Sequence, residues 1–110
     1  MQVATIVSPK VSRAIGTALT QVGGYSPASS AIVSCIVVCN TSGAAVTVQV
    51  TVFDGANDTN LAFNAPVAVG DSLVLGGGTL KIMLVSGWSI RVKSSAVTSV
   101  DATLGVTEFT

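Results

Sequence analysis

The side chains that could carry chemistry are few in this chain, and one common type is missing. The sequence has no histidine, so the usual general base near neutral pH is absent and neither a Ser-His-Asp nor a Cys-His arrangement can form. Asp54 and Asp58 lie close together in sequence and are the best candidates for a pair of carboxylates. They flank an Asp-Gly turn sequence, and such turns favour Asp for their own hydrogen bonding. We therefore predict turn residues here and no catalytic residue in the chain.

The same loop is the best candidate for a metal site. Its Asp and Asn side chains offer oxygen atoms to Ca²⁺, but the residue order of an EF-hand loop and its bidentate Glu are missing. The glycines at 76–78 lack the Lys-Ser/Thr pair that follows in a phosphate-binding loop, so they indicate a flexible hairpin tip. We predict no metal and no cofactor.

Two cysteines, Cys35 and Cys39, lie in one strand-like run. At about 3.3 Å per residue, we expect their Cα atoms about 13 Å apart, which is too far for a disulfide. With no histidine and no second cysteine pair, a zinc site is not favoured either. We expect two buried free thiols that pack like small hydrophobic side chains, with an intermolecular disulfide as the alternative.

The composition is unusually poor in charge. Charged residues make up 9% of the chain and hydrophobic residues 49%, whereas soluble domains average about 25% charged residues. The net charge is zero, so we expect no attraction to nucleic acid or to a membrane surface, and little repulsion between copies. The first residues lack the pattern of a signal peptide, and no apolar run is long enough for a transmembrane helix. We expect the protein to be made in a cytoplasm.

The pattern of residues 31–110 is typical of β-strands. Residues 31–39 are almost continuously apolar and β-branched, which predicts a central strand covered on both faces. Residues 45–53 alternate between valine and polar residues, and the turn sequence at 40–43 predicts that the two runs form a hairpin. Short strands at this spacing predict an all-β, single-domain β-sandwich. Further strands are expected at 60–64, 72–75, 80–84, 89–94 and 97–109.

Two glycines introduce similar short segments. Gly70 and Gly87 each begin the pattern Gly-x-Ser-aliphatic-x-aliphatic, which places a glycine turn before a strand at two equivalent corners. Paired corners of this kind suit a jelly-roll-like double sheet, and chance similarity in a chain rich in small residues is the alternative.

Residues 1–30 read differently from the rest of the chain. Their apolar residues are irregularly spaced, and Pro9, Gly16 and Pro27 interrupt them. We interpret residues 1–30 as an extended N-terminal arm with an edge strand near 14–19, ahead of a β-sandwich domain at 31–110. The arm is expected either to fray or to dock on a neighbouring subunit.

Several segments between residues 31 and 108 carry a family pattern. The central motif is Gly87-Trp88-Ser89-Ile90-Arg91-Val92-Lys93-Ser94-Ser95, preceded by strand-like runs at 72–75 and 80–84 and followed by Val100-Asp101-Ala102-Thr103-Leu104 and Glu108. Upstream lies a turn and strand start, Cys39-Asn40-Thr41-Ser42-Gly43 with Val46 and Val48. This pattern resembles small virion structural proteins of tailed bacteriophages. The sequence departs from that family at Trp88, where Asp is usual, and at Gly105, where Ser is common.

The resemblance implies a β-sandwich component of a phage capsid, neck or tail. Several such proteins are trimeric cement or decoration proteins that stabilise the head. The chain is accordingly expected to form a homo-oligomer, with a trimer favoured, to contact the major capsid protein or other virion subunits, and to reside in the virion. A neck, tail or fibre-base subunit is the alternative, and a carbohydrate-binding module is a third hypothesis.

The residues expected at interfaces lie in the arm, at one corner and on one basic strand. Arg91 and Lys93 share a strand face, and Lys81 is expected to lie near them; we expect a solvated face here, with an acidic contact on a partner as the alternative. Trp88 follows a glycine at a corner, where a buried plug and an exposed anchor are equally expected. The interface candidates are Val3, Ile6, Val7, Lys10, Arg13, Trp88, Arg91 and Lys93.

Overall fold

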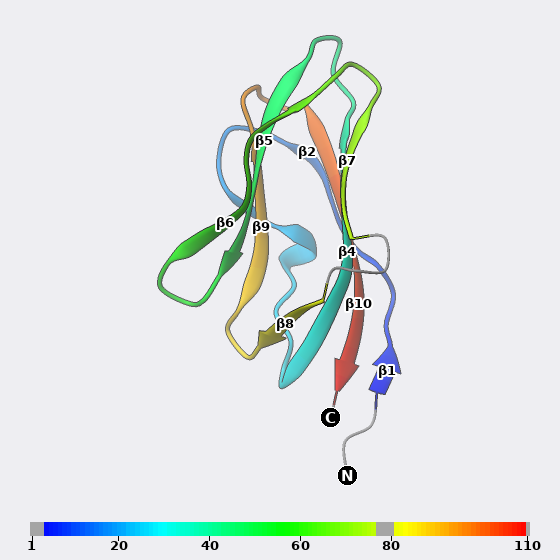
Figure 1. Ribbon diagram of the computed structural model, residues 1–110, viewed down its shortest axis with the longest axis vertical. Helices are drawn as coiled ribbons and strands as arrows, with labels where there is room; N and C mark the ends of the chain where they lie inside the picture. Colours follow the sequence, from blue (N-terminus) through cyan, green and yellow to red (C-terminus); the bar gives the residue numbers. More distant parts are fainter. Residues whose placement is uncertain (1–3, 77–80, 110) are drawn as a thin grey trace.

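Two antiparallel β-sheets face each other in the computed structural model, which describes residues 4–76 and 81–109 (Figure 1). The described part of the chain contains ten strands and one short 3-10 turn, η1 (Val22–Gly24). In chain order the strands are β1 (Ala4–Ile6), β2 (Lys10–Ile15), β3 (Thr20–Gln21), β4 (Ser30–Asn40), β5 (Val46–Phe53), β6 (Asp58–Val67), β7 (Ser72–Leu75), β8 (Ile82–Val85), β9 (Ser89–Ser94) and β10 (Val100–Phe109).

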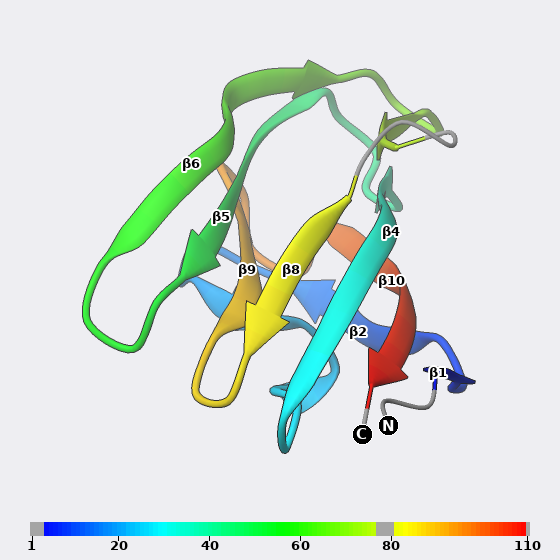
Figure 2. The same cartoon turned by 60° about the horizontal axis from the view of Figure 1, so that its bottom comes forward.

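The strands pair in a nested order. In one sheet, called sheet A here, β10 lies between β4 and the two short strands β1 and β2, and β4 pairs on its other side with β7 and β8. In the other, sheet B, the order is β3-β9-β5-β6. Figure 2 shows β8 beside β4 in one layer and β9 beside β5 in the other. Strands that are distant in sequence therefore pair around a central β5–β6 hairpin, which is the strand order of a jelly roll. The predicted all-β, jelly-roll-like sandwich is confirmed.

The core lies between the sheets and is built mainly from valine, isoleucine and leucine. On β5, Val46, Val48 and Val50 are buried while the intervening side chains point outward, because successive strand residues face opposite sides. On β10, Val100, Ala102, Leu104 and Val106 are buried in the same way. Fully burying one such aliphatic side chain contributes roughly 1.5–3 kcal/mol.

The first predicted hairpin is wrong. β4 belongs to sheet A and β5 to sheet B, so the segment between them is a corner that crosses from one sheet to the other. Buried Asn40 holds this corner: its side-chain amide donates to the carbonyls of Ala44 (2.8 Å) and Val67 (3.1 Å) and its Oδ1 accepts from the Ser42 N–H (2.9 Å). A polar side chain buried at the corner satisfies backbone groups that a hairpin would pair between its own strands.

The other strands follow the predictions closely. The strands expected at 72–75 and 89–94 have the predicted bounds, and Gly70 and Gly87 precede them with φ of 73° and 88°. β6 is longer than expected, and β8 and β10 begin later, at Ile82 and Val100. The hairpin tip predicted at 76–78 falls largely outside the described residues, which include only Gly76 of the three.

The N-terminal segment contributes strands to both sheets. In place of one strand at 14–19, β2 pairs with β10 in sheet A and β3 pairs with β9 in sheet B. Both strands lie at sheet edges, and β1 pairs with β10 of the same chain. Ala14 has a positive φ of 54° at an irregularity in the pairing of β2 with β10, and its N–H donates to Asp101 Oδ1 (2.9 Å). Residues 4–6 and 10–21 are therefore held by the sandwich itself.

Candidate functional site

The carboxylates singled out from the sequence have structural partners. Asp54 Oδ1 accepts hydrogen bonds from the N–H groups of Asn57 (2.7 Å) and Ala56 (2.9 Å), which lower the pKa of Asp54 because they stabilise its charged form. Asp58 accepts from Thr51 Oγ1 (2.8 Å) and pairs with Arg91 (3.3 Å). Within residues 4–76 and 81–109, no cluster of three or more His, Cys, Asp or Glu could hold a metal ion. The described carboxylates of this loop thus shape a turn and a strand pair.

One tyrosine is tied to a carboxylate at the end of the sandwich. The side chain of Tyr25 is buried, and its hydroxyl donates to Glu108 Oε2 at 2.6 Å. Burial and the charge of Glu108 raise the pKa of Tyr25 well above its usual range, because both disfavour the phenolate. Lys10 lies over the same ring, with Nζ 5.0 Å from its centroid. This cluster links β2, the segment after η1 and the last strand.

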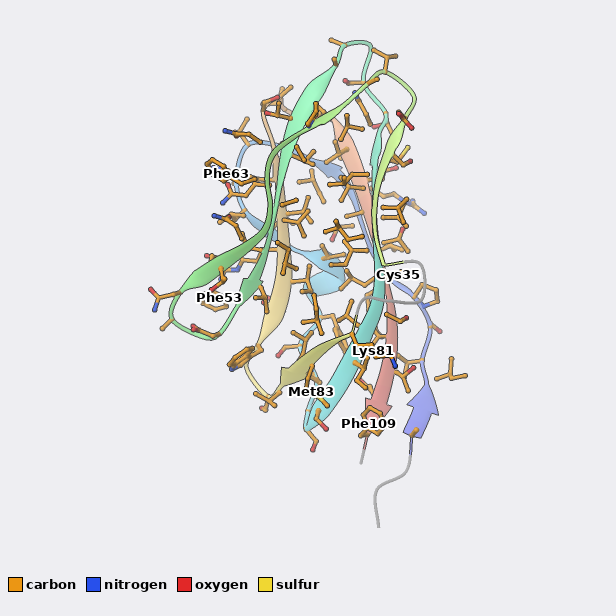
Figure 3. All side chains as sticks on the ribbon, viewed as in Figure 1. Cys35, Phe53, Phe63, Lys81, Met83 and Phe109 are labelled. Carbon is orange, nitrogen blue, oxygen red and sulfur yellow. The ribbon has the colours of Figure 1, made fainter. Side chains whose placement is uncertain are left out.

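The outer side of sheet B is polar, and we call it the polar face. Its residues come from β5, β6 and β9 and are Gln49, Asp58, Asn60, Arg91 and Lys93, together with fully buried Thr51 and with Phe63, whose side chain is 62% exposed (Figure 3). The side chains bond to one another: Gln49 Nε2 donates to Asn60 Oδ1 (2.7 Å), and the Arg91 guanidinium lies 3.6 Å from the Phe53 ring centroid while it pairs with Asp58.

A shallow pocket of about 250 Å³ opens on the polar face. Its lining contains one cation, Lys93, and no aromatic or acidic side chain. Small-molecule sites are usually concave and lined by hydrophobic and aromatic side chains with a few convergent polar groups, and this lining has no aromatic side chain. The pocket lining is Thr17, Thr47, Val48, Gln49, Asn64, Lys93, Ser94 and Ser95.

The outer side of sheet A is apolar, and we call it the apolar face. On β4, Ile32 and Val37 point outward while Ala31, Val33, Ile36 and Val38 are buried. Neighbouring strands extend the face, since Val74 pairs with Val37 and Met83 pairs with Ile32. The side chain of Val74 is 58% exposed and that of Met83 is 50% exposed. The face consists of Ile6, Val11, Ile32, Val37, Val74 and Met83.

Both cysteines also lie on the apolar face, and the expectation that they are buried is wrong. Cys35 and Cys39 are free thiols of intermediate exposure, and Figure 3 shows Cys35 on the side of β4 away from sheet B. Their strand positions point outward because the register of β4 places Ile36 and Val38 in the core. The Sγ atom of Cys35 lies over Gly105, where an added Cβ would stand 3.0 Å from it.

The structure distributes the predicted interface residues over the whole molecule. Ile6 is 88% exposed on the apolar face, and Val7 packs against the core. Arg13 is exposed on β2. Lys10 lies over Tyr25, and Val3 lies outside the described residues.

The predicted corner residue, Trp88, and the predicted basic residues also lie in different parts of the molecule. Trp88 is half-buried and packs against the core, and its carbonyl accepts from Ser26 Oγ (2.7 Å). Arg91 and Lys93 share the polar face as predicted, but Lys81 adjoins β8 of sheet A, so the expected three-cation patch does not form.

The apolar face is the feature that the list of interface candidates largely missed. Ile32, Val37, Val74 and Met83 were not among the candidates, because those were chosen for charge, aromaticity or position in the arm. The signal was present in the sequence: residues 31–39 are apolar at both odd and even positions.

No helix within the described ranges is long and apolar enough to cross a membrane.

Comparison with known proteins identifies no family. No family model matches the chain, and no curated protein matches it. Among solved structures, one described as the infectious bursal disease virus Gx strain is similar, with 12% sequence identity and a TM-score of 0.39. The match covers 99% of this chain and 29% of that one, so the chain spans under a third of the length of the viral chain.

Proposed function

We propose that this chain is a structural protein of a tailed-phage virion, a capsid cement or decoration protein that oligomerises and bridges capsid subunits. The observation that carries the proposal is the apolar face, on which Val74, Met83 and Ile6 are at least half exposed. Large exposed apolar patches on small soluble domains mark contact surfaces. The sequence resemblance to phage virion proteins supplies the kind of assembly.

The mechanism is additive contact free energy. A specific interface of this kind buries about 1,200–2,000 Å² in total, and many weak contacts repeated over a shell give a large summed resistance to internal pressure. The proposal includes a homo-oligomer, with a trimer as the favoured form, and contacts to the major capsid protein. It assigns no catalytic step, cofactor, nucleic acid or membrane to the chain, and places the protein in the virion after synthesis in the host cytoplasm.

A neck, tail or fibre-base subunit would use the same contact chemistry at another position. The two alternatives differ in symmetry, since cement proteins of this kind occupy three-fold positions of the head while neck and tail subunits form rings on the tail axis. A carbohydrate-binding module is less well supported, because the pocket on the polar face has no aromatic lining.

Electron cryo-microscopy of particles that carry the protein tests the proposal. Density for the jelly roll at three-fold or quasi-three-fold positions on the head is the expected result. Density confined to the tail axis would replace the cement role by the neck or tail role. A chain that associates with no particle and stays monomeric at high concentration would overturn both.

A further inference from the structure

We infer that the apolar face of sheet A packs against the same face of a second copy of this chain. The inference rests on the self-association in the proposed function and names the surface responsible. It is carried by the strand composition of β4, the continuity of the face across its neighbours, its size, and its lack of charge.

The composition of β4 requires an explanation, because it is apolar on both sides. Antiparallel sheets with one face in water usually alternate hydrophobic and polar residues, and strands that are apolar throughout are usually covered on both faces. On β4, Ile36 and Val38 fill the core, yet Ile32 and Val37 also point outward. The described part of the chain packs sheet B against only one side of sheet A.

The neighbouring strands continue the same chemistry. Val37 lies between Val74 of β7 and Thr103 of β10, and Val11 of β2 pairs with Thr103 on the far side. Cross-strand neighbours on one face of a sheet are about 4.5–5.5 Å apart, so these side chains form a continuous row. A second row runs through Met83, Ile32, Thr107 and Ile6.

Sheet A, which carries the apolar face, has an outline about as large as one side of a standard protein interface. β4 has 11 residues, which at about 3.3 Å per residue gives a length of about 36 Å. Sheet A is four strand positions wide, or about 19 Å at about 4.8 Å per strand. The product is roughly 700 Å², close to the ~800 Å² that each partner contributes to a stable interface.

The charge distribution favours a second copy as the occupant. The charged residues of sheet A near this face are Arg13 and Asp101 towards one end and Lys81 beside β8, so a charged partner would find little to pair with. Two identical apolar faces need no charge complementarity, and the zero net charge of the chain gives little repulsion between copies. Two sheets stack face to face at about 10 Å, and a patch that contacts itself generates a two-fold axis.

A matched pair of variants tests the inference. Thr103→Lys puts an ammonium group in the middle of the apolar face, and nearby Asp101 keeps the charge acceptable in the monomer. Thr47→Lys makes the same change on a central strand of sheet B, among the polar residues around the pocket. Fluorescence of Trp88, the single tryptophan, confirms that each variant is folded.

The first readout is the mass of the full chain by light scattering over a concentration series. We expect the wild type and Thr47→Lys to form dimers, or hexamers if two trimers of the proposed function pair through this face, since a patch that contacts itself makes a two-fold contact. We expect Thr103→Lys to raise the dissociation constant by at least about 100-fold, because an ammonium group would lose its water between two apolar faces. Equal dissociation of both variants, or masses in odd multiples only, would overturn the inference.

The second readout is the reaction of Cys35 and Cys39 with a soluble thiol reagent. Both thiols lie on the apolar face and are partly accessible in the single chain, so association should slow their reaction at least about tenfold and dilution should restore it. In Thr103→Lys the reaction should be fast at every concentration.

The same experiments separate this inference from the proposed function. A wild type that is monomeric in solution, but whose thiols become protected on phage particles, would show that a capsid protein covers the face; the virion role would stand and the inference would fail. A wild type that forms even-numbered oligomers with protected thiols, but binds no particle, would leave the inference standing and remove the virion role. Thiol protection only by lipid vesicles would overturn both.

Discussion

The hydrogen bond from Tyr25 to Glu108 should contribute measurably to folding stability. It joins positions that are 83 residues apart and ties the segment after η1 to the last strand. The Tyr25→Phe substitution keeps the buried ring and removes only the hydroxyl. A hydrogen bond to a charged group contributes about 1.5–3 kcal/mol, so we expect the free energy of unfolding to fall by about that amount near neutral pH.

The effect of this substitution should depend on pH. The pKa of Tyr25 is raised in the folded protein by burial and by the charge of Glu108. In the unfolded chain a tyrosine ionises around pH 10. Because the neutral phenol of Tyr25 is preferred in the folded protein, keeping Tyr25 neutral stabilises the folded state. This stabilisation is complete below the unfolded pKa and is lost as the pH rises towards the higher folded pKa, at up to about 1.4 kcal/mol per pH unit. The Tyr25→Phe variant has no ionisable group at residue 25, so residue 25 causes no loss of its folding stability at alkaline pH.

The assay is urea unfolding of both proteins at neutral pH and about one unit above the usual tyrosine pKa, followed by Trp88 fluorescence. Tyr25 is the single tyrosine of the chain, so the ultraviolet absorbance of tyrosinate reports its ionisation alone. We expect the two stabilities to converge at high pH. A loss below about 0.5 kcal/mol at neutral pH, or ionisation of folded Tyr25 at its ordinary pKa, would refute the reasoning.

Three further substitutions should give distinct stability changes in urea unfolding. Asn40→Ala should cost about 2–4 kcal/mol, because it leaves buried backbone groups of the β4–β5 corner without partners; a loss below about 1 kcal/mol would contradict this role. Gly105→Ser should cost about 1–3 kcal/mol by crowding the Cys35 thiol and the Ser34 hydroxyl, and less in a Cys35→Ala background, whereas additive effects would argue against the contact with Cys35. Arg91→Met should cost under about 1 kcal/mol, since its pair with Asp58 is partly exposed; a larger, salt-independent loss would be unexpected.

The parts of the fold that the sequence predicted well are those controlled by local residues. The bounds of β7 and β9 follow from a glycine turn before each strand, and Gly70 and Gly87 have the positive φ that such turns require. The turn after β5 was predicted from Asp54, which caps it with two hydrogen bonds. These features depend on neighbours a few residues away, so the sequence contains what is needed to find them.

The choice of sheet was not predictable in the same way. Alternation tells which residues of a strand share a face, but not whether the next strand pairs with it or crosses to the other sheet. The corner between β4 and β5 is decided by Asn40, whose amide contacts a carbonyl 27 residues away. Likewise, β2 and β3 are short and irregular in pattern, and they are held by β10 and β9 from the far end of the chain.

The candidate site was missed for a related reason. Charged and aromatic residues drew attention as interface anchors, yet Arg91, Lys10 and Trp88 already have partners within the chain. Among the side chains without comparable partners are ordinary valine, isoleucine and methionine residues on the outer side of sheet A. Aliphatic residues are unremarkable singly, and only the register of four strand positions shows that they form one surface.

The contrast between the two outer faces has a consequence for the orientation of each copy in an assembly. Covering the apolar face removes aliphatic side chains from water with few charges to desolvate, whereas covering the polar face would desolvate the Arg91–Asp58 pair and Lys93, which costs far more. A jelly roll of this composition should therefore turn sheet A towards its own copy. Sheet B, with its shallow pocket beside Lys93, then remains directed outward for water or for a partner that carries a carboxylate.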